Sequence, residues 1–220
     1  MFVLSTIQTI AVWILPVLLA ITLHEAAHAY VAHRLGDNTA KMMGRLSLNP
    51  IRHVDLVGTI IVPIVVAVLS QFQFVFGWAK PVPINYNQLH NPKRDMALVA
   101  AAGPISNLAM ALIWACLLKI GLLLDPRTSI LALFLALSGQ AGILINLILA
   151  FLNLIPIPPL DGSRVLMRFL PPHLAVQYIK IEPFGVFIIL GLLLTNILSL
   201  ILSPPIMGSM HLIRALFNIN

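Results

Sequence analysis

Charged side chains and cysteines are scarce in this chain of 220 residues. Asp, Glu, Lys and Arg together make up 9% of it, whereas hydrophobic residues make up 60%. Such a composition excludes a soluble globular domain and is typical of a polytopic membrane protein. Cys116 is the only cysteine, so an intramolecular disulfide cannot form and a thiolate metal site is not expected.

Long polar regions and clusters of basic residues are also missing. The longest mainly polar stretches are residues 33–55, 71–95 and 161–182, and none is long enough to form an independent core. The net charge of +6 is spread over loops, so a nucleic-acid partner is not expected and contact with the lipid bilayer is. We predict one membrane-embedded domain, residues 1–220, and no cleavable signal peptide.

Long apolar stretches predict an all-α fold with about five to six transmembrane segments. Simple spans are expected at residues 7–31, 96–124, 129–154 and 184–203. Two further apolar stretches are shorter: residues 56–70 cross or re-enter, and residues 205–217 are interfacial or a partial span. Residues 38–50 are expected to form a small hairpin or loop, and residues 71–95 irregular backbone.

The predicted first span contains two histidines and a glutamate, which lipid would not tolerate without compensation. His24 and His28 lie four residues apart and therefore project from one face of a helix, one turn apart. Two imidazoles at this spacing are typical of a zinc site, in which Glu25 takes a proton from water. A chance match is a weak explanation inside an apolar span.

A catalytic zinc ion needs a third protein ligand. Besides Glu25, Asp161 is the only acidic residue that abuts an apolar span, and it follows three prolines that must end the preceding helix. Backbone that is unwound at membrane depth indicates a site. We therefore predict Asp161 as the third ligand; the alternative is that it caps the next helix.

Two asparagines in the apolar spans are candidates for the group that stabilises the oxyanion. Asn107 and Asn153 each place an amide in hydrocarbon. For either one, an interhelical hydrogen bond is an equally good explanation. His53 and Asp55, which flank the start of residues 56–70, are assigned solvated loop roles.

The basic residues favour one topology. If residues 56–70 crossed once, Lys and Arg would be divided six against six between the two sides. If they re-enter, the division becomes ten against two, with Arg214 left aside. The positive-inside rule favours re-entry, with the metal site toward the cytoplasm. That topology also brings Asp161 to the same side as His24 and His28.

Three stretches resemble the signature regions of the site-2 protease family of intramembrane zinc metalloproteases: HEAAHAYVAHRLGD (residues 24–37), AAGPISNL (101–108) and NLIPIPPLDG (153–162). FGWAKPVPIN (76–85) resembles a segment of the family's short prokaryotic members, which lack a PDZ or CBS domain. The resemblance implies an enzyme of the prokaryotic cell membrane that cleaves transmembrane helices of membrane-protein substrates. It also implies one zinc ion on His24, His28 and Asp161, Glu25 as the base, and assistance by Asn107 or Asn153.

Two other functions fit parts of the pattern. A divalent-metal or proton transporter would use the same histidines and aspartate as a transit site, and an inactive relative would bind helices without cutting them. Glu25 separates the first from a hydrolase, because a transporter would tolerate its replacement by glutamine. For an enzyme, the backbone of residues 81–85 is a candidate edge for binding an unwound substrate as an added strand.

Overall fold

The computed structural model describes residues 5–53, 55–62, 65 and 80–219. Its described residues form helices joined by turns and loops, with no strand, so the predicted all-α class is confirmed. Five helices are long and apolar enough to cross a membrane: Ile7–Arg34, Pro92–Leu123, Ile130–Asn153, Pro172–Leu194 and Ile197–Phe217. The predicted number of five to six agrees with this finding.

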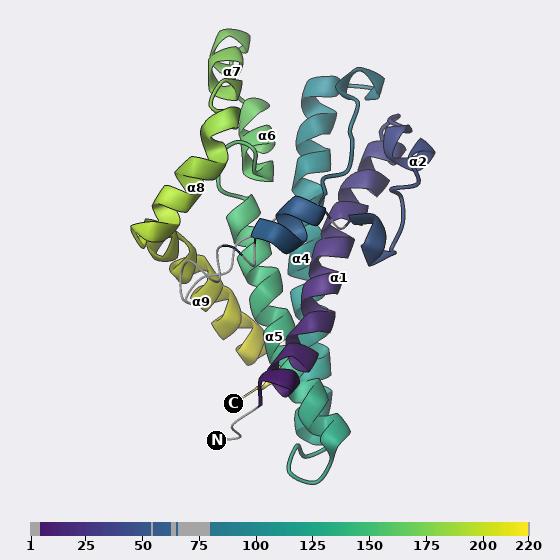
Figure 1. Cartoon of the computed structure of the whole chain (residues 1–220), viewed down its shortest axis with the longest axis vertical. Coiled ribbons are helices and arrows are strands. Elements are labelled where there is room, and N and C mark those ends of the chain that lie inside the picture. Colours follow the sequence, from purple (N-terminus) through teal and green to yellow (C-terminus); the bar gives the residue numbers. More distant parts are fainter. Residues whose placement is uncertain (1–4, 54, 63–64, 66–79, 220) are drawn as a thin grey trace.

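Three long helices form the centre of the molecule: α1 (Thr6–Arg34), α4 (Pro92–Leu123) and α5 (Ile130–Asn153). They run alongside one another in Figure 1, with α4 antiparallel to the other two. Many of the residues buried along α4 and α5 are Ala and Gly, which lets helix backbones approach closely where lipid supplies no hydrophobic drive. Trp114 and Leu147 anchor the cluster that also holds Ile213 of α9.

The start of α4 lies four residues before the predicted one. Pro92 occupies the first turn, where its missing N–H costs nothing. The buried Asp95 carboxylate accepts a hydrogen bond from the Asn91 N–H at 2.7 Å and an acidic group there also suits the helix dipole. The proline that suggested irregular backbone therefore begins the helix.

Of the two forms expected for residues 38–50, a small hairpin or a loop, the hairpin is wrong. Residues 38–50 contain instead the one-turn helix α2 (Thr39–Met42) and lead into η1 (Pro50–His53). Asp37 stabilises this turn, because its carboxylate accepts a hydrogen bond from the Thr39 N–H at 2.8 Å. A short η2 follows (Leu56–Ile61), with Asp55 accepting from the Gly58 N–H at 2.7 Å. It lies across the long helices, not along them (Figure 1).

The residues on either side of the short apolar stretch 56–70 and the stretch after it, His53 and Lys80, are in contact. The Lys80 N–H donates to the His53 carbonyl oxygen at 2.9 Å, whereas a single crossing between these residues would separate them by about 30 Å. His53 and Lys80 therefore lie on the same side, as the charge argument requires. The path of residues 66–79, on which re-entry depends, lies outside the described residues.

The last third of the chain is divided differently from the prediction. After α6 (Asp161–Met167), α7 (Pro172–Ile179) and η4 (Glu182–Phe184), two helices follow: α8 (Gly185–Leu194) and α9 (Ile197–Phe217). The break falls at Asn196, whose φ of 58° is left-handed, a conformation that asparagine tolerates better than most residues. Pro204 and Pro205, expected to separate two segments, lie inside α9, as membrane helices permit.

Candidate metal centre

Three side chains from two distant parts of the chain converge on one point. His24 and His28 lie one turn apart on α1, with Nε2 atoms 3.1 Å from each other. Asp161 Oδ2, from the start of α6, lies 3.1 Å from Nε2 of His24 and 3.3 Å from Nε2 of His28. The structure therefore brings together all three predicted ligands, and both histidines are buried.

Hydrogen bonds on the far side of each imidazole fix its orientation. His24 Nδ1 lies 2.6 Å from Asn107 Oδ1, and His28 Nδ1 lies 2.7 Å from the Val99 carbonyl oxygen. Both oxygens can only accept, so both Nδ1 atoms must carry the proton. Each neutral imidazole then turns the bare lone pair of Nε2 toward Asp161, which is the form that binds a metal ion.

Gly103 lets α4 approach the two histidines closely. A Cβ atom at this position would lie 2.6 Å from His24 Nε2, closer than non-bonded atoms come. Any larger residue would push α4 or the imidazoles away. The glycine of AAGPISNL therefore shapes the site and is not merely a flexible point.

Asp161 reaches the histidines because the helix before it ends. α5 stops at Asn153, and the proline-rich turn carries the chain back until α6 begins at Asp161. Leu160, not Asp161, is the N-cap of α6, and no side chain caps that helix. The alternative capping role for Asp161 is therefore wrong.

The three donor atoms fit a zinc ion. Ligand atoms around a tetrahedral ion with bonds of about 2.0–2.1 Å lie about 3.3–3.4 Å apart, close to the observed 3.1–3.3 Å. Oδ2 of Asp161 is buried without a hydrogen-bond partner, and the Nε2 atoms of His24 and His28 are the atoms that face it. A metal ion bound between the two imidazole nitrogens and the carboxylate would satisfy all three of these buried donor atoms.

Glu25 lies next to His24 in sequence, and its carboxylate is held from outside the helix. Its Oε2 accepts a hydrogen bond from the Val82 N–H at 2.9 Å. Val82 belongs to an extended stretch between Lys80 and η3 (Tyr86–Gln88). The candidate edge for substrate, residues 81–85, therefore has few free N–H groups, because Pro81 and Pro83 have none and that of Val82 already binds Glu25.

Asp37 fastens this extended stretch to the end of α1. Its second carboxylate oxygen accepts a hydrogen bond from the Asn85 N–H at 2.6 Å, and the side chain is fully buried. Nearby, the His90 N–H donates to the Leu35 carbonyl oxygen at 3.0 Å. The turn that ends α1 thus determines where the hydrogen-bond partner of Glu25 lies.

The two predicted asparagines have different surroundings. Asn107 is fully buried, and its NH₂ group donates both to the Ala20 carbonyl oxygen at 3.1 Å and to Asn146 Oδ1 at 2.9 Å. Both of its N–H groups are therefore used, so Asn107 orients His24 and has no donor left for an oxyanion. Asn153 donates to the Leu149 carbonyl oxygen of its own helix at 3.0 Å, and none of its described hydrogen bonds reaches the histidines.

Two polar residues were missed or misjudged from the sequence. Asn146, fully buried on α5, completes the chain of hydrogen bonds from His24 through Asn107 to the Gly142 carbonyl oxygen. It lies seven residues before Asn153, hence on the same helix face, and this spacing could have revealed it. His53 is buried at 2% exposure, with Nε2 2.9 Å from the Ser47 carbonyl oxygen, so its predicted solvated role is wrong.

Curated relatives carry names that agree with this geometry. "Putative zinc metalloprotease YwhC" of Bacillus subtilis is 37% identical over 208 residues, which cover 93% of this chain and 90% of that protein. The chain belongs to this zinc metalloprotease family. Another member, Rip2 of Mycobacterium tuberculosis, is 30% identical over 195 residues, or 88% of this chain and 69% of Rip2.

A more distant member of the zinc metalloprotease family matches over a shorter region. MJ0611 of Methanocaldococcus jannaschii is 38% identical over 68 residues, which cover 31% of each protein. No family model matches the chain, and no solved structure does. The relatives therefore show which family the chain belongs to, and the His-His-Asp geometry agrees with them.

Proposed function

We propose that the protein is an intramembrane zinc metalloprotease of the site-2 type, which hydrolyses peptide bonds within transmembrane segments of membrane-protein substrates. One observation carries the proposal: His24, His28 and Asp161 converge beside Glu25 within a bundle of membrane-spanning helices. A soluble metalloprotease would have no reason to embed this set in apolar helices. The names of the relatives support a metalloprotease.

Different residues of the chain bind the metal, transfer the proton and orient these groups. A zinc ion bound by the three ligands supplies a Lewis acid for the scissile carbonyl and makes water more acidic. Glu25 accepts the proton from the attacking water and returns it to the leaving amine. The Val82 N–H holds Glu25 Oε2 and so orients this carboxylate. Asn107 and Val99 keep the imidazoles turned toward the ion.

Asn107 is excluded as the oxyanion donor, because both of its N–H groups are engaged. We propose that Asn153 donates to the oxyanion instead. Asn153 donates one N–H to Leu149, which leaves the other for a reacting carbonyl. This proposal assigns the two asparagines different tasks. Asn107 supports the metal ligand, and Asn153 acts on the substrate.

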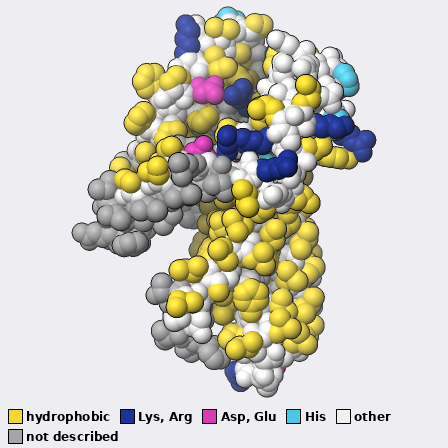
Figure 2. Space-filling model, turned by 45° about the vertical axis from the view of Figure 1, so that its right-hand side comes forward, with side chains coloured by type: hydrophobic (Ala, Val, Ile, Leu, Met, Phe, Trp, Pro, Cys, Tyr) yellow, Lys and Arg dark blue, Asp and Glu magenta, His cyan; other side chains and the backbone are white. Residues whose placement is uncertain are grey.

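The metal centre is proposed to lie toward the cytoplasm of a prokaryotic cell. Ten of the thirteen basic residues belong to the connections and helix ends on the side where α1 ends and α6 begins. Figure 2 agrees, since Lys and Arg gather on the upper part of the visible face and the lower part is largely hydrophobic. Positive residues are retained on the cytoplasmic side.

Replacement of Glu25 tests the function. Glu25→Gln keeps the size of the side chain and removes the base, so a protease should bind zinc normally and lose turnover by about 10²–10⁴-fold. Wild type and variant are purified and incubated with single-span substrates, and zinc is measured on both. A transporter would instead keep moving metal through the Glu25→Gln protein in vesicles.

Zinc absent from the wild type would overturn the assignment of the metal. Cleavage that survives in Glu25→Gln would overturn the mechanism, even if zinc is present. Glu182→Gln is the matched control, because Glu182 pairs with Arg164 at 3.1 Å and none of its described hydrogen bonds or ion pairs reaches the three ligands, so its turnover should stay near that of the wild type.

A further inference from the structure

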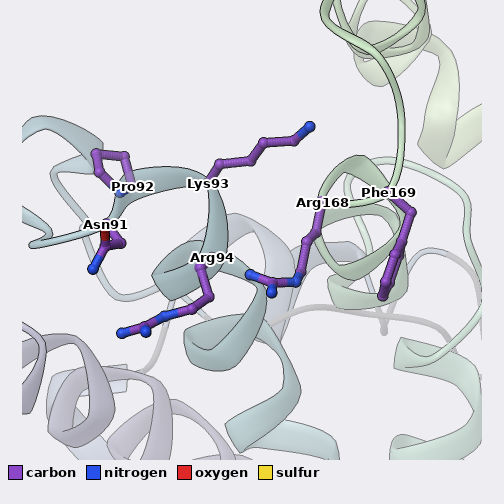
Figure 3. A pocket seen from close by; sticks show the side chains of 6 residues that line it. All are labelled: Asn91, Pro92, Lys93, Arg94, Arg168 and Phe169. Atoms are coloured by element: carbon purple, nitrogen blue, oxygen red, sulfur yellow. The ribbon is translucent and has the colours of Figure 1, made fainter.

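A basic hollow lies at the junction of α4 and α6. It has a volume of about 560 Å³ and is lined by Asn91, Pro92, Lys93, Arg94, Arg168 and Phe169. Figure 3 shows the Arg168 side chain extending from the end of α6 toward the side chain of Arg94 on α4, whose own guanidinium group points away from Arg168. Three cationic side chains therefore border one hollow that has no acidic residue among its lining residues.

The charges around this hollow are not balanced by the protein. The carboxylate of Asp95 is buried and already accepts hydrogen bonds from Arg94 Nε at 2.9 Å and the Asn91 N–H at 2.7 Å. The side chain of Arg168 has no ion pair or hydrogen bond within the part of the chain that the structure describes. Cationic side chains that line one hollow repel each other, and an anion bound among them would offset this repulsion.

We infer that this hollow binds a phosphate group, which joins Arg94 of α4 to Arg168 at the end of α6. Guanidinium groups bind phosphate oxygens in pairs of hydrogen bonds. The first turn of the long helix α4 also borders the hollow, and its dipole favours an anion there. Lys93 Nζ donates to the Leu170 carbonyl oxygen at 2.8 Å, which already ties α4 to the turn after α6 at this rim.

An anionic phospholipid is the expected source of the phosphate. Phe169 lies on the rim, is 73% exposed and comes just before the apolar span that begins at Pro172, where an exposed apolar ring favours the boundary between headgroups and acyl chains. Basic pockets between membrane helices on the cytoplasmic side bind lipid headgroups. A headgroup bound at this hollow would hold α4 and α6 together, and these helices carry two residues of the metal centre: α6 begins with Asp161 and α4 carries Asn107.

Lipid binding by purified protein tests the inference, independently of any protease activity. The protein is reconstituted in phosphatidylcholine with or without phosphatidylglycerol, and retained lipid is counted by native mass spectrometry. Wild type should retain phosphatidylglycerol over phosphatidylcholine, and Arg168→Gln should lower that preference about fivefold. Arg168→Gln is preferred to Arg94→Gln, because Arg94 also supports Asp95. Lys41→Gln removes an exposed cation on α2 and should have the same preference for phosphatidylglycerol as the wild type.

A second arm distinguishes the two sources of phosphate. Inorganic phosphate is titrated against protein in phosphatidylcholine alone, with thermal unfolding as the measurement. Stabilisation by free phosphate that is lost in Arg168→Gln, without a preference for phosphatidylglycerol, would keep the anion site and overturn the lipid as its ligand. Equal lipid retention and equal phosphate response in wild type and Arg168→Gln would overturn the inference altogether.

Discussion

At the scale of single residues, the metal centre depends on the absence of a side chain at Gly103. A Cβ there would lie 2.6 Å from Nε2 of His24, the atom that faces the other ligands. Gly103→Ala should therefore cost about 1–3 kcal/mol of overpacking and displace an imidazole. We expect purified Gly103→Ala to lose most of its zinc, as measured by metal analysis.

Another glycine serves as the control for this substitution. Gly191 lies in α8, and a Cβ there would meet nothing within 4 Å. Gly191→Ala should retain zinc and be neutral or slightly stabilising, since alanine favours helix by about 0.5–1 kcal/mol. Equal zinc content in Gly103→Ala and Gly191→Ala would contradict the close approach of α4 to the histidines.

Asn107 and Asn153 give a second contrast between single residues. Asn107→Ala removes the acceptor that holds Nδ1–H of His24, and loss of such a partner weakens metal binding by about 10–100-fold. Asn153→Ala leaves the described ligand contacts intact, so zinc affinity should be unchanged while kcat falls by about 10²-fold if Asn153 binds the oxyanion. Zinc competition with a chelator and steady-state kinetics measure the two effects.

At the scale of elements, the extended stretch after Lys80 links the end of α1 to Glu25. Asp37 fastens it through Asn85, and Val82 then reaches Glu25. Asp37→Ala would leave the N–H groups of Thr39 and Asn85 without their acceptor, at about 0.5–1.5 kcal/mol for each lost hydrogen bond. We expect a lower kcat with zinc retained, because the loosened stretch no longer orients the base.

Asp125 offers a matched control for Asp37. It also accepts a backbone hydrogen bond in a turn, from the Arg127 N–H at 3.0 Å, but between α4 and α5. Asp125→Ala should therefore change kcat little. If thermal unfolding shows both variants equally folded and their kcat values agree, the proposed link from Asp37 to Glu25 is wrong.

Element boundaries show what local sequence signals can predict. Ser129 and Leu154 bracket α5 within one residue of the prediction, because a hydroxyl cap and a proline run mark its ends. The start of α4 and the break before α9 were misplaced, since Pro92 begins a helix and Pro204 lies within one. A helix in a membrane protein tolerates proline at its first turn and also in its interior, and packing decides which of these positions a given proline takes.

At the scale of the whole molecule, the charge distribution predicts how the bundle is oriented in the membrane. Lys41 on α2 and Lys180 after α7 should be accessible from the cytoplasm, and Arg127, between α4 and α5, from the outside. Each is replaced by cysteine in a Cys116→Ser background and labelled with an impermeant maleimide in intact cells and in inverted vesicles. Labelling of position 127 from the same side as position 41 would overturn the topology.

The sequence by itself determined the membrane class, the approximate number of helical spans and the three candidate metal ligands. Those features depend on local patterns: long apolar runs, a four-residue spacing of histidines, and prolines that end a helix before Asp161. Only the tertiary structure decided that Asn107 orients His24, that Val82 holds Glu25, and that Arg94 and Arg168 line one hollow. These pairs are separated by tens of residues, so no periodicity brings them together. Their contacts depend on how closely whole helices pack, which at Gly103 is decided by one missing side chain.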